Sequence, residues 1–128
     1  MNNEKVEDFE VLFRAVKRAY PGFFDEKGNP LPALFLNEVG ISVDRDGGRK
    51  DDEVVEGFKR FFADRYRGTV KFKAEDCSKV GVYVEPDPSD GNPYHAQIYD
   101  SPNKEEITLL KAMYLTSKVI VIENLFRK

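Results

Sequence analysis

The chain contains one cysteine, one histidine and no tryptophan in 128 residues. Cys77 cannot form an internal disulfide, which suits a reducing cytoplasm, and thiolate zinc sites need several Cys or His ligands. Glu75 and Asp76 precede Cys77, and nearby carboxylates disfavour a thiolate, so we expect no nucleophilic cysteine.

Long apolar runs are also absent. No window approaches the roughly 18 consecutive apolar residues of a membrane-spanning helix. The acidic N-terminal segment, residues 1–8, lacks the apolar centre of a signal peptide. We therefore expect a cytoplasmic protein without a membrane partner.

The sequence carries no cofactor motif. Gly47 and Gly48 have neither the following Lys-Ser/Thr of a P-loop nor the G-x-G-x-x-G spacing of a dinucleotide site, and a His-Glu-x-x-His pair is impossible with one histidine. One loop is rich in carboxylates, but it lacks EF-hand spacing, and a helix start explains its later members. That loop contains Asp44, Asp46, Asp51, Asp52 and Glu53. We predict no cofactor and no metal.

Excess positive charge is missing as well. The 20 Lys and Arg against 23 Asp and Glu give a net charge of −3, which argues against sequence-independent binding of nucleic acid. Acidic residues interrupt the one basic stretch, so we interpret it as a solvated face. It contains Lys59, Arg60, Arg65, Arg67, Lys71 and Lys73.

The chain does contain enough apolar surface for one core. Residues of hydrophobic type make up 41%, with 10 Phe and 6 Tyr, and the length fits a single domain over residues 1–128. Apolar residues three and four apart predict a first helix over residues 4–19, although residues 11–16 fit a short strand equally well. Phe23 and Phe24, in a Pro- and Gly-rich loop over residues 21–31, are predicted to enter the core.

The middle of the chain alternates between strands and one helix. Residues 41–45 predict a strand with Ile41 and Val43 inward and Ser42 and Asp44 outward. A helix is expected from Asp51 to about residue 66, with Gly68 beyond its end. Strands follow at 69–73 and 80–85, separated by one possible helical turn at 74–78.

The last third begins with a proline-rich turn over residues 86–93 and a strand at 95–99. Ser101-Pro102 predicts the start of a helix. Its expected buried side chains are Ile107, Leu110, Met113 and Tyr114. The apolar run 118–123 predicts a strand buried on both faces or central in the sheet. The fold class is therefore α+β, with a single mixed or mostly antiparallel sheet and two or three helices packed on it.

Four polar residues are candidates for a site. His95 is the one side chain that titrates near neutrality and is the catalytic candidate, as a general base; alternatively its ring fixes the preceding turn. Arg14, Ser42 and Arg45 are candidate ligand-binding residues, and the side chains of Arg14, Arg45 and Arg49 are candidates to bind an anion or a dinucleotide. Arg45 lies between Asp44 and Asp46, so a surface ion-pair cluster is the competing interpretation.

Three motifs carry a family resemblance. They are Leu12-Phe13-Arg14, the Gly-Ile-Ser-Val strand at 40–43 and Asn-Pro-Tyr-His-Ala-Gln-Ile at 92–98. In order and spacing the chain resembles a loose group of small bacterial proteins that brings no established activity. This resemblance favours a strand at residues 11–16.

A weaker likeness is to ADP-ribosyltransferase-like domains, which place an arginine on their first strand and a serine on a later one. Arg14 and Ser42 stand in the corresponding places. The catalytic glutamate of that family has no clear counterpart here, and Gln97 and Glu123 are the candidate positions for it.

Three functional hypotheses follow. The first is a non-enzymatic interaction or accessory module of a bacterial multi-protein system, with a protein partner. The alternative is an enzyme acting on a nucleotide or nucleic acid, which requires Arg14, Ser42, Arg45 and His95 to share one cavity. The third is a homodimer joined through a sheet edge or the last helix.

Overall fold

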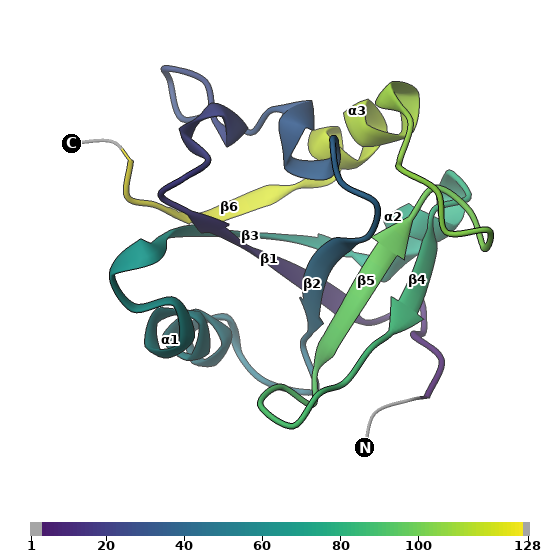
Figure 1. Ribbon diagram of the computed structural model, residues 1–128, viewed down its shortest axis with the longest axis horizontal. Coiled ribbons are helices and arrows are strands. Elements are labelled where there is room, and N and C mark those ends of the chain that lie inside the picture. Colours follow the sequence, from purple (N-terminus) through teal and green to yellow (C-terminus); the bar gives the residue numbers. More distant parts are fainter. Residues whose placement is uncertain (1–3, 127–128) are drawn as a thin grey trace.

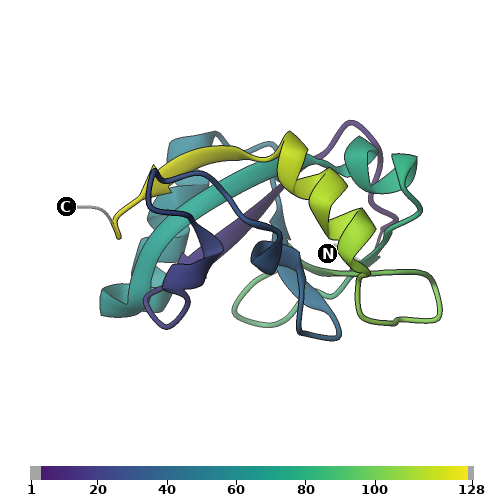
Figure 2. The same ribbon diagram turned by 90° about the horizontal axis from the view of Figure 1, so that it is seen from above.

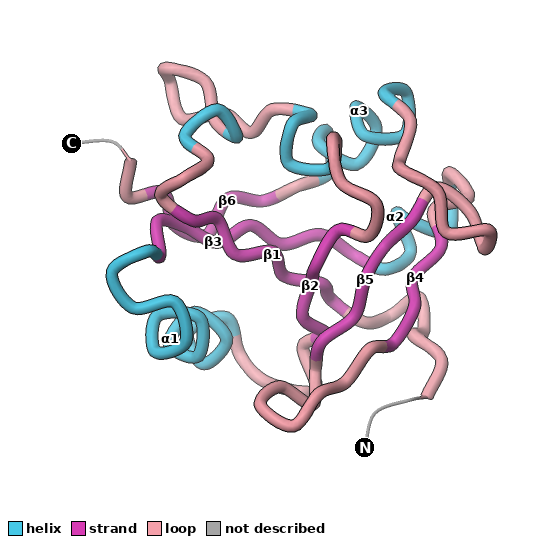
Figure 3. The backbone as a smooth tube through the Cα atoms, in the orientation of Figure 1, coloured by secondary structure: helices cyan, strands magenta, loops and turns pink. Residues whose placement is uncertain are grey.

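Six antiparallel strands form one sheet in the computed structural model, which describes residues 4–126 (Figures 1 and 3). The strands are β1 (Val11–Lys17), β2 (Ile41–Arg45), β3 (Tyr66–Lys73), β4 (Tyr83–Pro86), β5 (His95–Tyr99) and β6 (Ile120–Asn124). The helices are α1 (Asp51–Phe62), α2 (Ala74–Lys79) and α3 (Leu109–Lys118). The strand order β4-β5-β2-β1-β3-β6 confirms the predicted α+β class and the mostly antiparallel sheet.

The first element is a strand, so the predicted helix over residues 4–19 is wrong. β1 is central and pairs with β3 along its whole length, from Val11 opposite Lys73 to Lys17 opposite Tyr66. Leu12 enters the core on one face of the sheet, while Phe13 enters the core on the other. A strand buried on both faces has no polar alternation, and its apolar run therefore imitated helical spacing.

The structure moves three other predicted boundaries. α1 ends at Phe62 and not near residue 66, because Ala63 adopts a positive φ of 52° and the chain turns into β3; Gly68 therefore lies inside a strand. Residues 101–108 are not helical, and α3 begins at Leu109. The predicted strand at 80–85 shifts to β4.

The last helix and last strand also differ from expectation. Ala112 and Leu115 are the buried residues of α3, whereas Leu110 and Met113 are 79% and 50% exposed. β6 lies at the sheet edge and not at its centre. The predicted core residues Phe23 and Phe24 are buried, as is Ile107.

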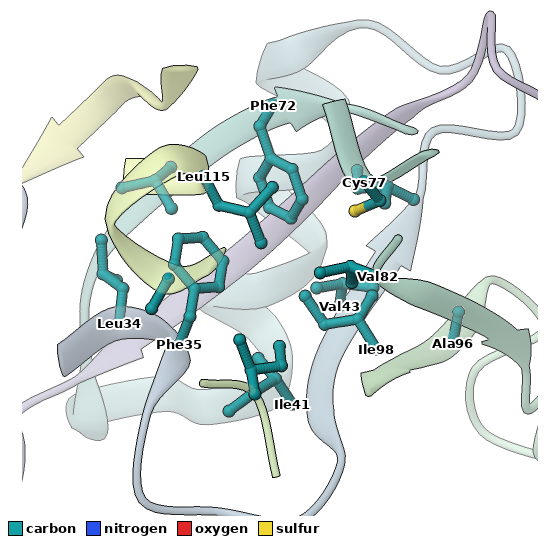
Figure 4. Close-up of a cluster of buried hydrophobic side chains, with 14 of the residues drawn as sticks. Leu34, Phe35, Ile41, Val43, Phe72, Cys77, Val82, Ala96, Ile98 and Leu115 are labelled. Atoms are coloured by element: carbon teal, nitrogen blue, oxygen red, sulfur yellow. The ribbon is translucent and has the colours of Figure 1, made fainter. Parts of the chain in front are cut away.

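The main core occupies one face of the sheet. Leu34 and Phe35, from the short 3-10 helix Pro32–Phe35, pack there with Leu115 of α3 and with Ile41 of β2 (Figure 4). Figure 2 shows this 3-10 segment and α3 side by side above the sheet. Both segments cover the same face, which accounts for most of the buried apolar residues.

The opposite face is covered over only part of its width. α1 packs Val54, Val55 and Phe58 against Phe13 of β1 and Tyr66 of β3. β1 and β2 pair at only two positions, Leu12 opposite Arg45 and Phe13 opposite Asp44, and then diverge (Figure 3). This divergence leaves space beside α1, over β2 and the start of β5.

Within residues 4–126, none of the helices is both long and apolar enough to cross a membrane.

Candidate functional site

A cavity of about 790 Å³ lies where β1 and β2 separate, beside α1. β1, β2 and β5 contribute residues to its lining, and α1 contributes Gly57, Arg60 and three phenylalanine residues. The turn between β4 and β5 closes the far side. The strand residues that line it include Phe13, Arg14, Ser42, Asp44 and His95.

Arg14 fills the gap between the two diverging strands. Its Nε donates a hydrogen bond to the Leu34 carbonyl at 2.8 Å, and Nη1 donates to the Ser42 carbonyl at 3.1 Å. The guanidinium also lies 5.4 Å from the ring centre of Phe23. These contacts fix the side chain in one orientation. The residue is buried, and only 7% of its surface is exposed.

The charge of Arg14 has no carboxylate partner. No acidic group of residues 4–126 lies within 4.0 Å of it. Burial lowers the pKa of Arg14 to about 10, and the more distant Glu38 opposes this only in part. Within the same range Nη2 has no hydrogen-bond partner. Because every fully buried side-chain nitrogen of these residues has a partner, Nη2 is not fully buried and is accessible to solvent. An anion in the cavity would meet an oriented cation.

Asp44 forms part of the cavity floor. It was expected on the solvent side of its strand, but only 7% of the residue is exposed. Asn92 Nδ2 donates to its Oδ1 at 2.8 Å, and Arg49 Nη2 lies 3.7 Å from Oδ2. Burial raises the pKa of Asp44, outweighing the lowering by Asn92, Arg49 and His95. Such a carboxylate in a cleft is typical of functional sites.

His95 is paired directly with Asp44 across the two strands. Its Nδ1 lies 3.1 Å from the carbonyl oxygen of Asp87 and 3.2 Å from Asp87 Oδ2. Both partners are acceptors, so Nδ1 carries the proton and Nε2 of the neutral ring is an acceptor. Both hypotheses for His95 therefore have a structural counterpart, because the ring holds the turn and also lines the cavity.

Aromatic side chains form the rest of the wall and the rim. Arg49 stacks on the ring of Tyr94 at 3.7 Å and is held by the carbonyls of Asp46 and Arg45. At the other end Phe61 is 68% exposed and Tyr20 is 40% exposed, and both line the cavity. The rim thus presents aromatic faces next to arginine.

Arg45 does not belong to the site, so its prediction as a ligand-binding residue is corrected. Its Nε and Nη2 each donate to one carboxylate oxygen of Glu10 at 2.8 Å. Nη1 donates to the carbonyl of Glu4, and the side chain lies away from the cavity lining. Nor is this a surface cluster, because the two side chains are only 6% and 12% exposed.

Three of the four predicted residues therefore share the cavity: Arg14, Ser42 and His95. Neither Gln97 nor Glu123 lines it. Asp44 belongs to the carboxylate-rich loop of the sequence, but only the pairing of β2 with β5 brings it next to His95. Arg49, an anion-binding candidate from the sequence, lies beside Asp44. Tyr94 and Asn92 carried a weaker signal, their place in the turn before His95.

Two other sequence expectations concern reactive groups. Cys77 is buried, and burial raises its pKa to about 12, with Asp76 adding to the effect. In the part of the chain that the structure describes, His, Cys, Asp and Glu form no group of three or more that could hold a metal ion.

Comparisons with protein-family models, with curated proteins and with solved structures find no match to this chain.

Proposed function

We propose that the protein binds a nucleotide in the cavity between β1, β2 and α1 and acts on it, with Arg14 holding a phosphate group. The observation that carries this proposal is the buried guanidinium of Arg14, which has no carboxylate of residues 4–126 within 4.0 Å. A buried charge is costly unless it is paired, and proteins normally pair it internally, as this one does with Arg45. An anionic ligand supplies the missing partner.

The rim supports a ligand with a planar ring. Phe61 and Tyr20 expose aromatic surface at the cavity mouth, where large apolar side chains gain nothing from solvent. Lys17 Nζ lies 5.8 Å from the ring centre of Tyr20 and adds positive charge to this end. Aromatic faces with nearby cations are the common means of binding bases next to phosphates.

His95 supplies the group that makes an enzymatic role chemically reasonable. His95 lines the cavity, and Asp87 orients its ring through Nδ1, which leaves Nε2 without a partner among residues 4–126. This is the arrangement of a general base positioned by a carboxylate. Arg14 and Ser42 line the same cavity, which supports the likeness to ADP-ribosyltransferase-like domains. The glutamate in that lining is Glu38, which precedes β2 and does not lie on a late strand, and this counts against the likeness.

Thermal unfolding with added ligand tests the proposal. At a concentration 100 times its Kd, a bound nucleotide adds about 2.7 kcal/mol of stability, which raises the Tm of a domain of this size by roughly 10 °C. We would titrate ADP, NAD and inorganic phosphate. Absence of any shift up to millimolar concentrations would contradict a nucleotide site.

Two variants of Arg14 and a matched control locate the binding. Arg14→Gln should abolish the ligand-induced rise in Tm, and Arg14→Lys should keep part of it, because a lysine retains the charge without the planar fork. Arg18→Gln is the control, since Arg18 is exposed, pairs with Asp64 and does not line the cavity. An unchanged ligand-induced rise in Tm in Arg14→Gln would show that Arg14 does not bind the phosphate.

The exposed face of α3 favours a second proposal, the interaction or accessory module. Leu109, Leu110 and Met113 are each at least half exposed, and Ile120 at the start of the edge strand β6 is 56% exposed. An apolar surface of this kind typically marks a protein contact. Light scattering should then show self-association or, with a candidate partner added, a complex that Met113→Glu disrupts; a monodisperse monomer in both cases would count against it.

A further inference from the structure

The end of the cavity farthest from the aromatic rim is rich in hydrogen-bond acceptors. A carboxylate can accept about four hydrogen bonds, and Asp44 receives one from Asn92. His95 Nε2 accepts in the neutral ring and has no partner among residues 4–126. Asp87 adds a half-exposed carboxylate beside it. A ligand group here must therefore donate hydrogen bonds.

The charges around this end favour a neutral donor over a cation. Arg49 Nη2 already lies 3.7 Å from Asp44 Oδ2, and its guanidinium is fixed on Tyr94. Arg14 stands on the other side, bonded to the Ser42 carbonyl. A ligand ammonium group would meet both arginines, whereas hydroxyl groups donate to Asp44 and His95 without this repulsion.

The spacing of donors and acceptors suits one ligand. Ser42 and Asp44 are two residues apart on β2, which is about 7 Å along a strand. The Arg14 guanidinium lies at Ser42, and the acceptors lie at Asp44 and His95. A phosphate on the arginine would therefore be followed, a few bonds further along the ligand, by groups that face the acceptors.

We infer that the acceptor end of the cavity recognises the vicinal hydroxyl groups of a ribose, so that the ligand is a ribonucleotide with free 2′ and 3′ hydroxyls. Asp44 is the main acceptor, and His95 accepts from the second hydroxyl. This inference rests on the proposed nucleotide site and adds the sugar to it. It assigns Asp44, and not only the arginine, to ligand selection.

Calorimetric titration of the wild-type protein separates the two claims. ADP, 2′-deoxy-ADP and 3′-deoxy-ADP share the base and the diphosphate and differ only in the sugar. Loss of a hydroxyl that donates to a buried carboxylate should raise Kd about tenfold or more. Equal Kd values for the three ligands would overturn the ribose inference while leaving the nucleotide site intact. No binding of any of them would overturn the proposed function itself.

Asp44→Asn then assigns the acceptor. An amide keeps the shape and can still bond Asn92, but it is a weaker acceptor, so the ratio of deoxy to ribo Kd should fall toward one. Asp90→Asn is the control, because Asp90 lies in the same turn as Asp87 and does not line the cavity. A ratio that stays tenfold in Asp44→Asn, with circular dichroism showing an intact fold, would overturn the role of Asp44.

Discussion

Two buried arginines lie on neighbouring strands of the same sheet, and their surroundings differ completely. Arg45 on β2 makes a two-pronged contact with Glu10 and further hydrogen bonds to the backbone of the N-terminal segment. Among residues 4–126, Arg14 on β1 donates hydrogen bonds to carbonyl groups only, and it lines a cavity. Both are less than a tenth exposed, so burial does not distinguish them. What distinguishes them is whether the protein itself supplies the opposite charge.

The largest effect is expected at the paired arginine. Arg45→Met should lower the free energy of unfolding by about 3 kcal/mol or more, because it leaves the Glu10 carboxylate buried without its partner. Urea denaturation followed by circular dichroism measures this. The double variant Arg45→Met/Glu10→Leu should recover part of the loss, and a double variant as unstable as the single one would contradict the explanation.

A smaller loss of stability is expected at the unpaired arginine. Arg14→Met removes a buried charge together with two hydrogen bonds to carbonyls, so the opposing contributions leave a cost of about 1–2 kcal/mol. The same urea experiment compares it directly with Arg45→Met. If Arg14→Met proved the more destabilising of the two, Arg14 would be a structural residue and the contrast between the arginines would fail.

Gly57 offers a test with a modest effect in the opposite direction. It lies in the middle of α1 and lines the cavity, and a Cβ there would meet only Arg49 Nη1 at 4.0 Å. Gly57→Ala should raise the free energy of unfolding by about 0.5–1 kcal/mol, because alanine favours the helix. A rise in Tm would confirm that glycine at this position of the cavity wall lowers the stability of the fold. A fall in Tm would show that the added methyl group clashes with its neighbours.

The smallest expected effects concern the direction in which the free energy of unfolding changes with pH. Burial acts to raise the pKa of Glu10, but hydrogen bonds from Arg45 and the Glu7 backbone and the charge of Arg45 lower it below 4.5 overall. Glu10 therefore stabilises the fold above its unfolded pKa, and this contribution is lost as pH falls through the lower folded value. Glu10→Gln should flatten the acid limb of the stability profile.

Asp44 should behave in the opposite way. Burial raises its pKa above 3.8, so ionisation costs stability as pH rises from the unfolded to the folded pKa. Asp44→Asn should therefore become more favourable, relative to wild type, between pH 3 and pH 7. Urea titrations at both pH values measure the difference. Equal changes at both pH values would show that the cavity tolerates the charge without penalty.

Local sequence patterns predict the elements whose apolar residues alternate along the chain. The alternation of Ile41 and Val43 located β2, and the strand expected at residues 95–99 matches β5. For β1 the pattern fits a helix and a strand equally well, because neighbouring residues enter opposite cores, and the structure confirms the strand. Ser101-Pro102 imitated a helix start, but Ser101 instead bonds Glu105 within a turn, and Lys104 adopts a positive φ.

The site was predictable only in part, for a similar reason. The chemistry of His95, Arg14 and Ser42 makes them candidates from the sequence, and all three line the cavity. The separation of β1 from β2, however, arises from strand pairing over the whole sheet, and no local pattern encodes it. The partner of Arg45 is 35 residues away in the chain, so its neutralisation by Glu10 was equally invisible.

The short junction between β1 and β2 divides the sheet into two ribbons of three strands, β4-β5-β2 and β1-β3-β6. Only two residue pairs between β1 and β2 join the ribbons, and the cavity lies directly beside these pairs. A molecule bound there contacts both ribbons at once and bridges the junction between them. Slower exchange of the backbone amides along that junction would then report occupancy, whatever the occupant's chemistry.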